Sequence, residues 1–312
     1  MWVPLNKPFR QFSYFLITCL VSLTACEEPI ESPVELVDPS LVITSTFAPN
    51  KLVEVRLFAS QPITGEAQVL DVKNADVRIY EGQEHLETLV YEPGIEGATG
   101  VYKTVNFRPE VGKVYTLLAS AGGYTPVSAE SAIPTSIPIR SLVISDLSTQ
   151  MVGEYMVYDF FLTVDYDDPL EEGDFYDLRI SQEVIPYRVI GGDTTFYDVM
   201  TKGLQAPNSP INTSPAFTQA SVLVKDKPME GGLQVQLQAR LKPNQEVLGD
   251  LIAELRTVAE PYYQFQRTIQ GEGTVFGGIG EPAINTYTNV KQGYGLFAGY
   301  SSYTWSRPLS AN

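Results

Sequence analysis

The acidic segment Asp165–Asp177 concentrates side chains that could bind a metal ion, with seven carboxylates in thirteen residues. Calcium takes about six to eight oxygen ligands, often from one flexible loop. A calcium site is therefore one interpretation. Asp-Pro and Glu-Gly pairs are also typical of a solvated turn between strands, and the segment lacks the EF-hand ligand order, so both interpretations stay open. The candidate ligands are Asp165, Asp167, Asp168, Glu171 and Asp174.

Aromatic side chains near the C-terminus could form a platform that binds a ligand. The segment Gly293–Tyr300 alternates small and aromatic residues, which also predicts a final core strand whose glycines admit another backbone closely. Both interpretations are kept. The candidate platform residues are Tyr287, Tyr294, Tyr300, Tyr303 and Trp305.

Residues for nucleophilic or zinc-dependent catalysis are scarce. The chain has one histidine, His85, and two cysteines, and it lacks the Gly-x-Ser-x-Gly elbow of hydrolases. Paired carboxylates for glycoside hydrolysis are left open, because sequence does not set their separation. We expect no enzyme, with a surface hydrolase as the weakest alternative, and no cofactor apart from the candidate calcium ion.

The charge balance argues against nucleic-acid binding. The chain carries 21 basic and 37 acidic residues, a formal charge of −16, which phosphate backbones would repel. Its 44% hydrophobic and 11% aromatic content is typical of a folded protein. A length of 312 residues predicts about two domains.

Residues 1–25 have the pattern of a lipoprotein signal peptide. Lys7 and Arg10 precede the apolar run Phe12–Leu23, which is shorter than the roughly 20 residues that span a bilayer. The run ends in Leu-Thr-Ala-Cys26, which resembles a bacterial lipobox. We expect Cys26 to be the lipid attachment point, through which the chain is anchored to a membrane.

Residues 26–40 are predicted to form a tether. Glu27 and Glu28 follow the cysteine directly and resemble the surface-export signal of lipoproteins in Bacteroidota. A solvated acidic linker explains the same residues. The first interpretation predicts a protein of the outer membrane, lipid-anchored and facing the cell exterior.

The rest of the chain is predicted to be mainly β. Short alternating runs such as Leu41–Phe47 and Lys113–Ala119, divided by turn residues, indicate an Ig-like β-sandwich over residues 41–132. Prolines 134 and 138 mark the crossing to a larger β-rich domain, residues 133–312.

The second domain is expected to contain one short helix. Leu233–Leu241 alternates most regularly, and we expect it to pair with Leu251–Val258. Glu260–Gln270 predicts the helix, because Pro261 suits its first position and Tyr262, Phe265 and Ile269 share one face.

Seven segments in order along the chain carry a family resemblance: Ala75–Tyr80, Gly100–Tyr102, Gly112–Leu117, Asp167–Pro169, Phe175–Tyr176, Pro261–Tyr263 and Thr288–Gly299. Together they resemble the Bacteroidota lipoproteins catalogued as domain of unknown function 4249. They are glycine turns and aromatic strand residues. The resemblance implies a surface lipoprotein and, as partner, a TonB-dependent outer-membrane receptor. It implies no catalytic residues.

We therefore expect a binding or accessory module for such a receptor, acting in the uptake of a nutrient or a metal complex. The alternative is a structural or adhesive protein of the cell envelope, which two sandwich-like domains on a tether would also suit.

Overall fold

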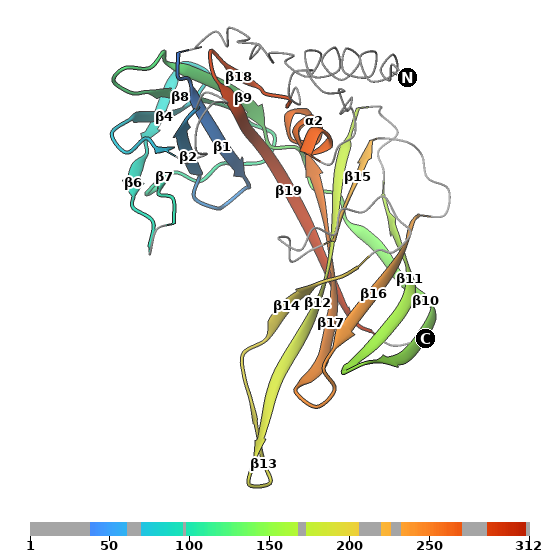
Figure 1. The fold of residues 1–312 in the computed structure, drawn as a ribbon. Helices are drawn as coiled ribbons and strands as arrows, with labels where there is room; N and C mark the ends of the chain where they lie inside the picture. Colours follow the sequence, from blue (N-terminus) through green and yellow to red (C-terminus); the bar gives the residue numbers. More distant parts are fainter. Residues whose placement is uncertain are drawn as a thin grey trace, which may run out of the picture. The chain divides into compact units, whose positions relative to one another are not determined.

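The computed structural model describes residues 38–60, 70–95, 98–167, 173–205, 220–225, 232–269 and 286–309. The chain from Pro39 onward forms one compact unit. Within the described residues the protein is mainly β, arranged as sandwich-like layers with a single short helix (Figure 1). The predicted fold class is thus confirmed.

The first sandwich consists of two layers of strands, and every second side chain of a strand points into the core between them. One layer holds β1 (Leu41–Phe47), β2 (Glu54–Ala59), β3 (Leu70–Asp71), β6 (Val90–Glu92) and β7 (Val101–Lys103). The other holds β4 (Asp76–Glu81), β5 (Glu84–Thr88), β8 (Val114–Ser120), β9 (Val127–Ala132) and β18 (Val290–Lys291). In β1, Leu41, Ile43 and Phe47 are buried against Val77 and other residues of the facing layer, as a half-buried strand requires.

The second sandwich is built from longer strands. A three-stranded layer contains β10 (Ile139–Val152), β11 (Tyr155–Tyr166) and β16 (Leu233–Leu241). The facing layer contains β12 (Phe175–Ile190), β13 (Asp193–Phe196), β14 (Met200–Gly203), β15 (Ala220–Lys225), β17 (Glu246–Val258) and β19 (Tyr294–Pro308). Apolar side chains of both layers form one cluster, exemplified by Phe160, Leu237 and Leu255.

The last strand, β19, belongs to both sandwiches. Its first half pairs in parallel with β1, from Val42↔Tyr294 to Phe47↔Gly299, and its second half pairs antiparallel with β17 (Figure 1). Short β18 likewise pairs with β9. The predicted domain boundary lies at residue 132. Strands from beyond it, β18 and the first half of β19, nevertheless pair with strands of the first sandwich.

The expected pairing of Leu233–Leu241 with Leu251–Val258 is wrong. β16 pairs with β11, whereas β17 pairs with β12 and β19 in the opposite layer. The turn between them, closed by hydrogen bonds from the N–H groups of Gln245 and Glu246 to Lys242 O, crosses from one layer to the other. Both strands bury their apolar faces in the same core. The alternation of apolar and polar residues therefore does not show whether two strands are neighbours in one layer or lie in opposite layers.

The predicted helix is present as α2 (Glu260–Ile269), with Pro261 in its first turn. Tyr262 and Tyr263 are its buried residues, and they pack with Phe175 of β12 and Leu296 of β19. The helix therefore covers the face of the β12–β17–β19 layer that lies opposite the main core. Among the described residues, no helix is long and apolar enough to span a bilayer.

Candidate functional site

A buried network of hydrogen-bonded side chains lies beneath α2, and we call it the α2 clamp: Asp177, Arg179, Ser221 and Tyr262. Asp177 is fully buried. Its Oδ2 accepts hydrogen bonds from Tyr262 Oη at 2.6 Å and Arg179 Nε at 2.8 Å, and its Oδ1 accepts one from Ser221 Oγ at 2.5 Å. Arg179 also donates to Tyr262 Oη at 2.7 Å. The clamp ties the helix to β12 and β15.

The strand register brings these residues together. Asp177 and Arg179 are two residues apart on β12, so both point to the α2 side, and Ser221 lies opposite Arg179 on β15. Burial and the charge of Asp177 raise the pKa of Tyr262. Burial alone would lower the pKa of Arg179, but the carboxylate outweighs it and the pKa is raised. The clamp therefore stays neutral at Tyr262 and charged at Arg179, which suits a structural role.

A second buried cation extends the clamp toward the first sandwich. Arg256 of β17 pairs with Glu254 at 2.9 Å, and its guanidinium lies 4.4 Å from the ring centroid of Tyr300 on β19. Both ion-pair side chains are largely buried. Tyr300 is thus held by a cation–π contact at the point where β19 passes from one sandwich to the other.

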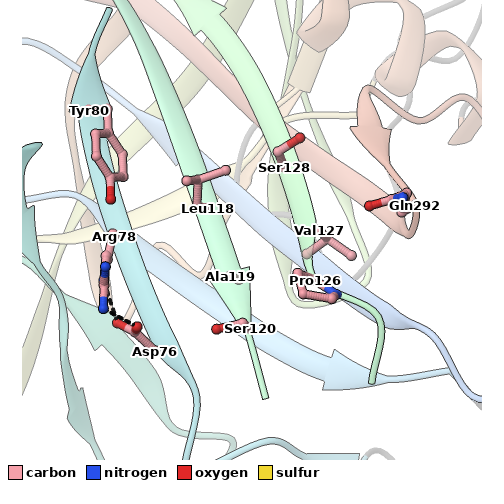
Figure 2. A pocket seen from close by; sticks show the side chains of 10 residues that line it. All are labelled: Asp76, Arg78, Tyr80, Leu118, Ala119, Ser120, Pro126, Val127, Ser128 and Gln292. Atoms are coloured by element: carbon pink, nitrogen blue, oxygen red, sulfur yellow. Dashed lines mark hydrogen bonds and ion pairs between the residues drawn. The ribbon is translucent and has the colours of Figure 1, made fainter. Parts of the chain in front are cut away.

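An open cleft of about 330 Å³ lies on the outer face of the β4–β8–β9 layer, and we call it the sheet cleft (Figure 2). Asp76, Arg78 and Tyr80 project from β4 and face Leu118 on β8, with Arg78 directly opposite Leu118 in register. The other lining residues are Ala119, Ser120, Pro126, Val127, Ser128 and Gln292.

The sheet cleft combines the chemistry expected of a binding surface. Leu118 is a large apolar side chain that is 41% exposed, and it lies beside the polar residues of β4. Arg78 and Asp76 form an exposed ion pair, and that pairing raises the pKa of Arg78. Tyr80 adds an aromatic ring beside His85, at 5.3 Å between centroids. Aromatic and arginine side chains are enriched in binding interfaces.

The candidate calcium ligands are only partly within the described residues. Asp168 and Glu171 lie outside them. Asp167 forms an ion pair with Arg140, and Asp165 lies at the end of β11, opposite Ser141. Asp174 precedes β12. In the part of the chain that the structure describes, no group of three or more acidic, histidine or cysteine side chains has the geometry to hold a metal ion.

The five candidate platform residues do not share one surface. Tyr294 is 51% exposed at the start of β19, and Tyr287 is half-buried, its N–H bonded to Thr268 on α2. Tyr300 packs beside α2, whereas Trp305 packs into the core on the opposite face of the layer. Tyr303 is 38% exposed and lies opposite Leu255 in register. The lipid-site and export residues, Cys26, Glu27 and Glu28, lie outside the described residues.

The prediction that glycines near the C-terminus admit close approach is confirmed. A Cβ on Gly295 would overlap the carbonyl oxygen of Ile43, and one on Gly299 would overlap that of Ala132. At both positions β19 lies directly against the backbone of the first sandwich. Gly295 also has φ of +105°, which L-residues with a side chain rarely adopt.

A partly buried ion pair at the start of β17 gives a pH-dependent prediction. Glu246 accepts hydrogen bonds from Lys202 Nζ at 2.5 Å and from the Lys242 N–H at 2.9 Å. Burial alone would raise the pKa of Glu246, but these two partners outweigh it and the pKa lies below its ordinary value of 4.5. Stability from this group is therefore present above pH 4.5 and lost as the pH falls through the lowered pKa.

We expect Glu246→Gln to reduce the free energy of unfolding by about 1 kcal/mol at pH 7. Urea denaturation of wild type and variant at pH 7 and at pH 3 measures it. The two proteins should converge at pH 3. An equal difference at both pH values would show that the carboxylate charge is not the cause.

Taken together, the strands and clefts define a mainly β protein of two sandwiches that share a strand and carry an open cleft on one outer sheet. Residues 27–306 match the family described as Domain of unknown function (DUF4249), and the chain belongs to that family. No curated protein matches the sequence.

Among solved structures, the chain is similar to the three N-terminal domains of the bacteriophage RB49 Highly Immunogenic Outer Capsid protein (Hoc), with 12% identity and a TM-score of 0.21. The similarity covers 71% of this chain and spans 64% of the length of that structure.

Proposed function

We propose that this chain is a surface-exposed lipoprotein of the outer membrane that serves as a binding or accessory module for a TonB-dependent receptor, in the uptake of a nutrient or a metal complex. The predicted lipid attachment at Cys26 and the acidic residues after it support the location. The family match begins at residue 27, directly after that cysteine.

The observation that carries the binding role is the sheet cleft. Most of its lining residues come from β4, β8 and β9, three neighbouring strands of one sheet, so their relative positions are set by the backbone ladder. Leu118 offers an apolar contact, while Asp76, Arg78 and Tyr80 offer polar and aromatic contacts in a row along one side of it. Protein–protein contacts combine apolar and polar side chains in this way.

Co-purification tests the proposal. The tagged full-length chain is isolated from detergent-solubilised outer membranes, and we expect a TonB-dependent receptor to be recovered with it. Leu118→Glu, which places a charge at the centre of the cleft, should reduce that recovery about tenfold or more. Val143→Glu is the matched control, because Val143 is equally exposed, at 42%, on the outer face of β10. If no receptor is recovered with wild type, the proposal fails.

A structural or adhesive role in the envelope has one specific observation in its favour. β19 runs through both sandwiches without interruption, so tension applied to one is passed to the other along a single strand. A deletion that weakens surface attachment while growth on every nutrient is unchanged would support this role over the first.

A further inference from the structure

A second cleft, of about 450 Å³, lies where the β1–β2 turn and the segment after β7 meet β19. We call it the basic cleft. Three cations line it, Lys51, Lys103 and Arg108, with a single carboxylate, Glu54. This local excess of positive charge occurs in a chain whose formal charge is −16.

Two of the three cations are available for a ligand. Lys103 is paired with Glu54 at 2.8 Å, and that hydrogen bond raises the pKa of Lys103. Among the described residues, neither Lys51 nor Arg108 lies within ion-pair distance of a carboxylate. Arg108 donates one hydrogen bond, at 3.1 Å, to the backbone oxygen of Asn106. Its fork-shaped guanidinium can therefore still donate to an oxyanion.

The backbone fixes the two loops that carry these cations. Asn50, with φ of 61°, donates its N–H to Pro109 O at 3.1 Å, which joins the turn before Lys51 to the residue after Arg108. Val53 and Thr104 add two further bonds between the same segments, Val53 N–H to Thr104 Oγ1 and Thr104 N–H to Val53 O. A site whose loops are already tied together loses less entropy when a ligand binds.

The aromatic wall of the cleft is fixed as well. Tyr300 follows Gly299, the partner of Phe47 in the parallel register, so β19 delivers the ring directly beside the β1–β2 turn. The ring stacks on the buried guanidinium of Arg256 at 4.4 Å. The cleft volume falls within the range of small-molecule sites.

We propose that the basic cleft binds a small multivalent oxyanion, through charge-assisted hydrogen bonds from Lys51 and Arg108. Phosphate and polycarboxylate groups share this chemistry. The inference rests on the proposed function only in treating the chain as a binding module, since the basic cleft and the sheet cleft have no lining residue in common.

Isothermal titration calorimetry of the full-length chain in detergent, at low ionic strength, tests the proposal with inorganic phosphate in one arm and citrate in the other. We expect at least one of the two anions to bind, and the anion that binds more tightly identifies the anion class. Lys51→Gln/Arg108→Gln should weaken that binding about tenfold or more, because both unpaired charges are lost.

The matched control is Lys73→Gln/Arg188→Gln, which removes the same charge from exposed positions outside the cleft and should bind like wild type. Thermal denaturation of both variants checks that the exposed substitutions leave the fold intact. Absence of binding in both arms, or equal weakening in the two double variants, would overturn the proposal. Receptor co-purification is read separately, so either proposal can fail while the other stands.

Discussion

Asp177→Ala is expected to destabilise the protein by about 3–5 kcal/mol, the effect of removing one partner from a buried ion pair. The substitution leaves the guanidinium of Arg179 without its carboxylate and the hydroxyl groups of Ser221 and Tyr262 without their acceptor. Helix α2 would then lose the hydrogen bond from Tyr262 to the Asp177 carboxylate and keep the one between Arg179 and Tyr262. Urea denaturation at pH 7, followed by circular dichroism, measures the change.

The chain contains its own matched control for this prediction. Asp76-Val-Arg78 on β4 repeats the Asp-x-Arg spacing of Asp177-Leu-Arg179, with both side chains of the pair 43–48% exposed. Asp76→Ala should therefore cost no more than about 1 kcal/mol, because water replaces the lost partner. Equal costs at the two sites would contradict the account of the α2 clamp as a buried network.

Gly295→Ala is expected to destabilise the protein by about 3 kcal/mol or more, since two penalties add at this position. The residue has φ of +105°, and a Cβ would overlap the backbone carbonyl of Ile43. Backbone atoms cannot yield as a flexible side chain can, so β19 would have to move away from β1. The free energy of unfolding measures the cost.

Gly112→Ala separates the two penalties. Gly112 also has a positive φ, +80°, but nothing lies within 4 Å of the place that a Cβ would take there. Gly112→Ala should therefore reduce the free energy of unfolding only by the cost of placing an L-residue at a positive φ, about 1–2 kcal/mol. If Gly295→Ala costs no more than Gly112→Ala, the close parallel pairing of β1 with β19 is not what the fold depends on.

Local patterns predict most strands and the helix. Apolar residues recur every second residue in a half-buried strand and about every 3.6 residues in a helix, and both spacings are visible within a short segment. Leu41–Phe47 and Leu233–Leu241 are strands as expected, and the helix is present over Glu260–Ile269. The second half of the strand β10 could not be predicted from a local pattern. After Ser145 it is mostly exposed and mixes polar with apolar residues, so it lacks the alternation that marks a half-buried strand.

Partners in space could not be predicted from the same patterns. By sequence Asp177 belongs to the acidic segment, yet it lies two residues inside β12 and is fully buried. Its partner Tyr262 is 85 residues away, and no local spacing connects them. Lys51 and Arg108 carry no local signal either, because they meet only through the pairing of two distant loops.

Site-specific photo-crosslinking in intact cells tests the proposed binding role most directly. A photoreactive amino acid replaces Leu118 in the sheet cleft in one strain and Val143 on the outer face of β10 in another. We expect a TonB-dependent receptor to be captured from position 118 and not from position 143. Capture from neither position, or equally from both, would contradict the assignment of the sheet cleft as the receptor-binding surface.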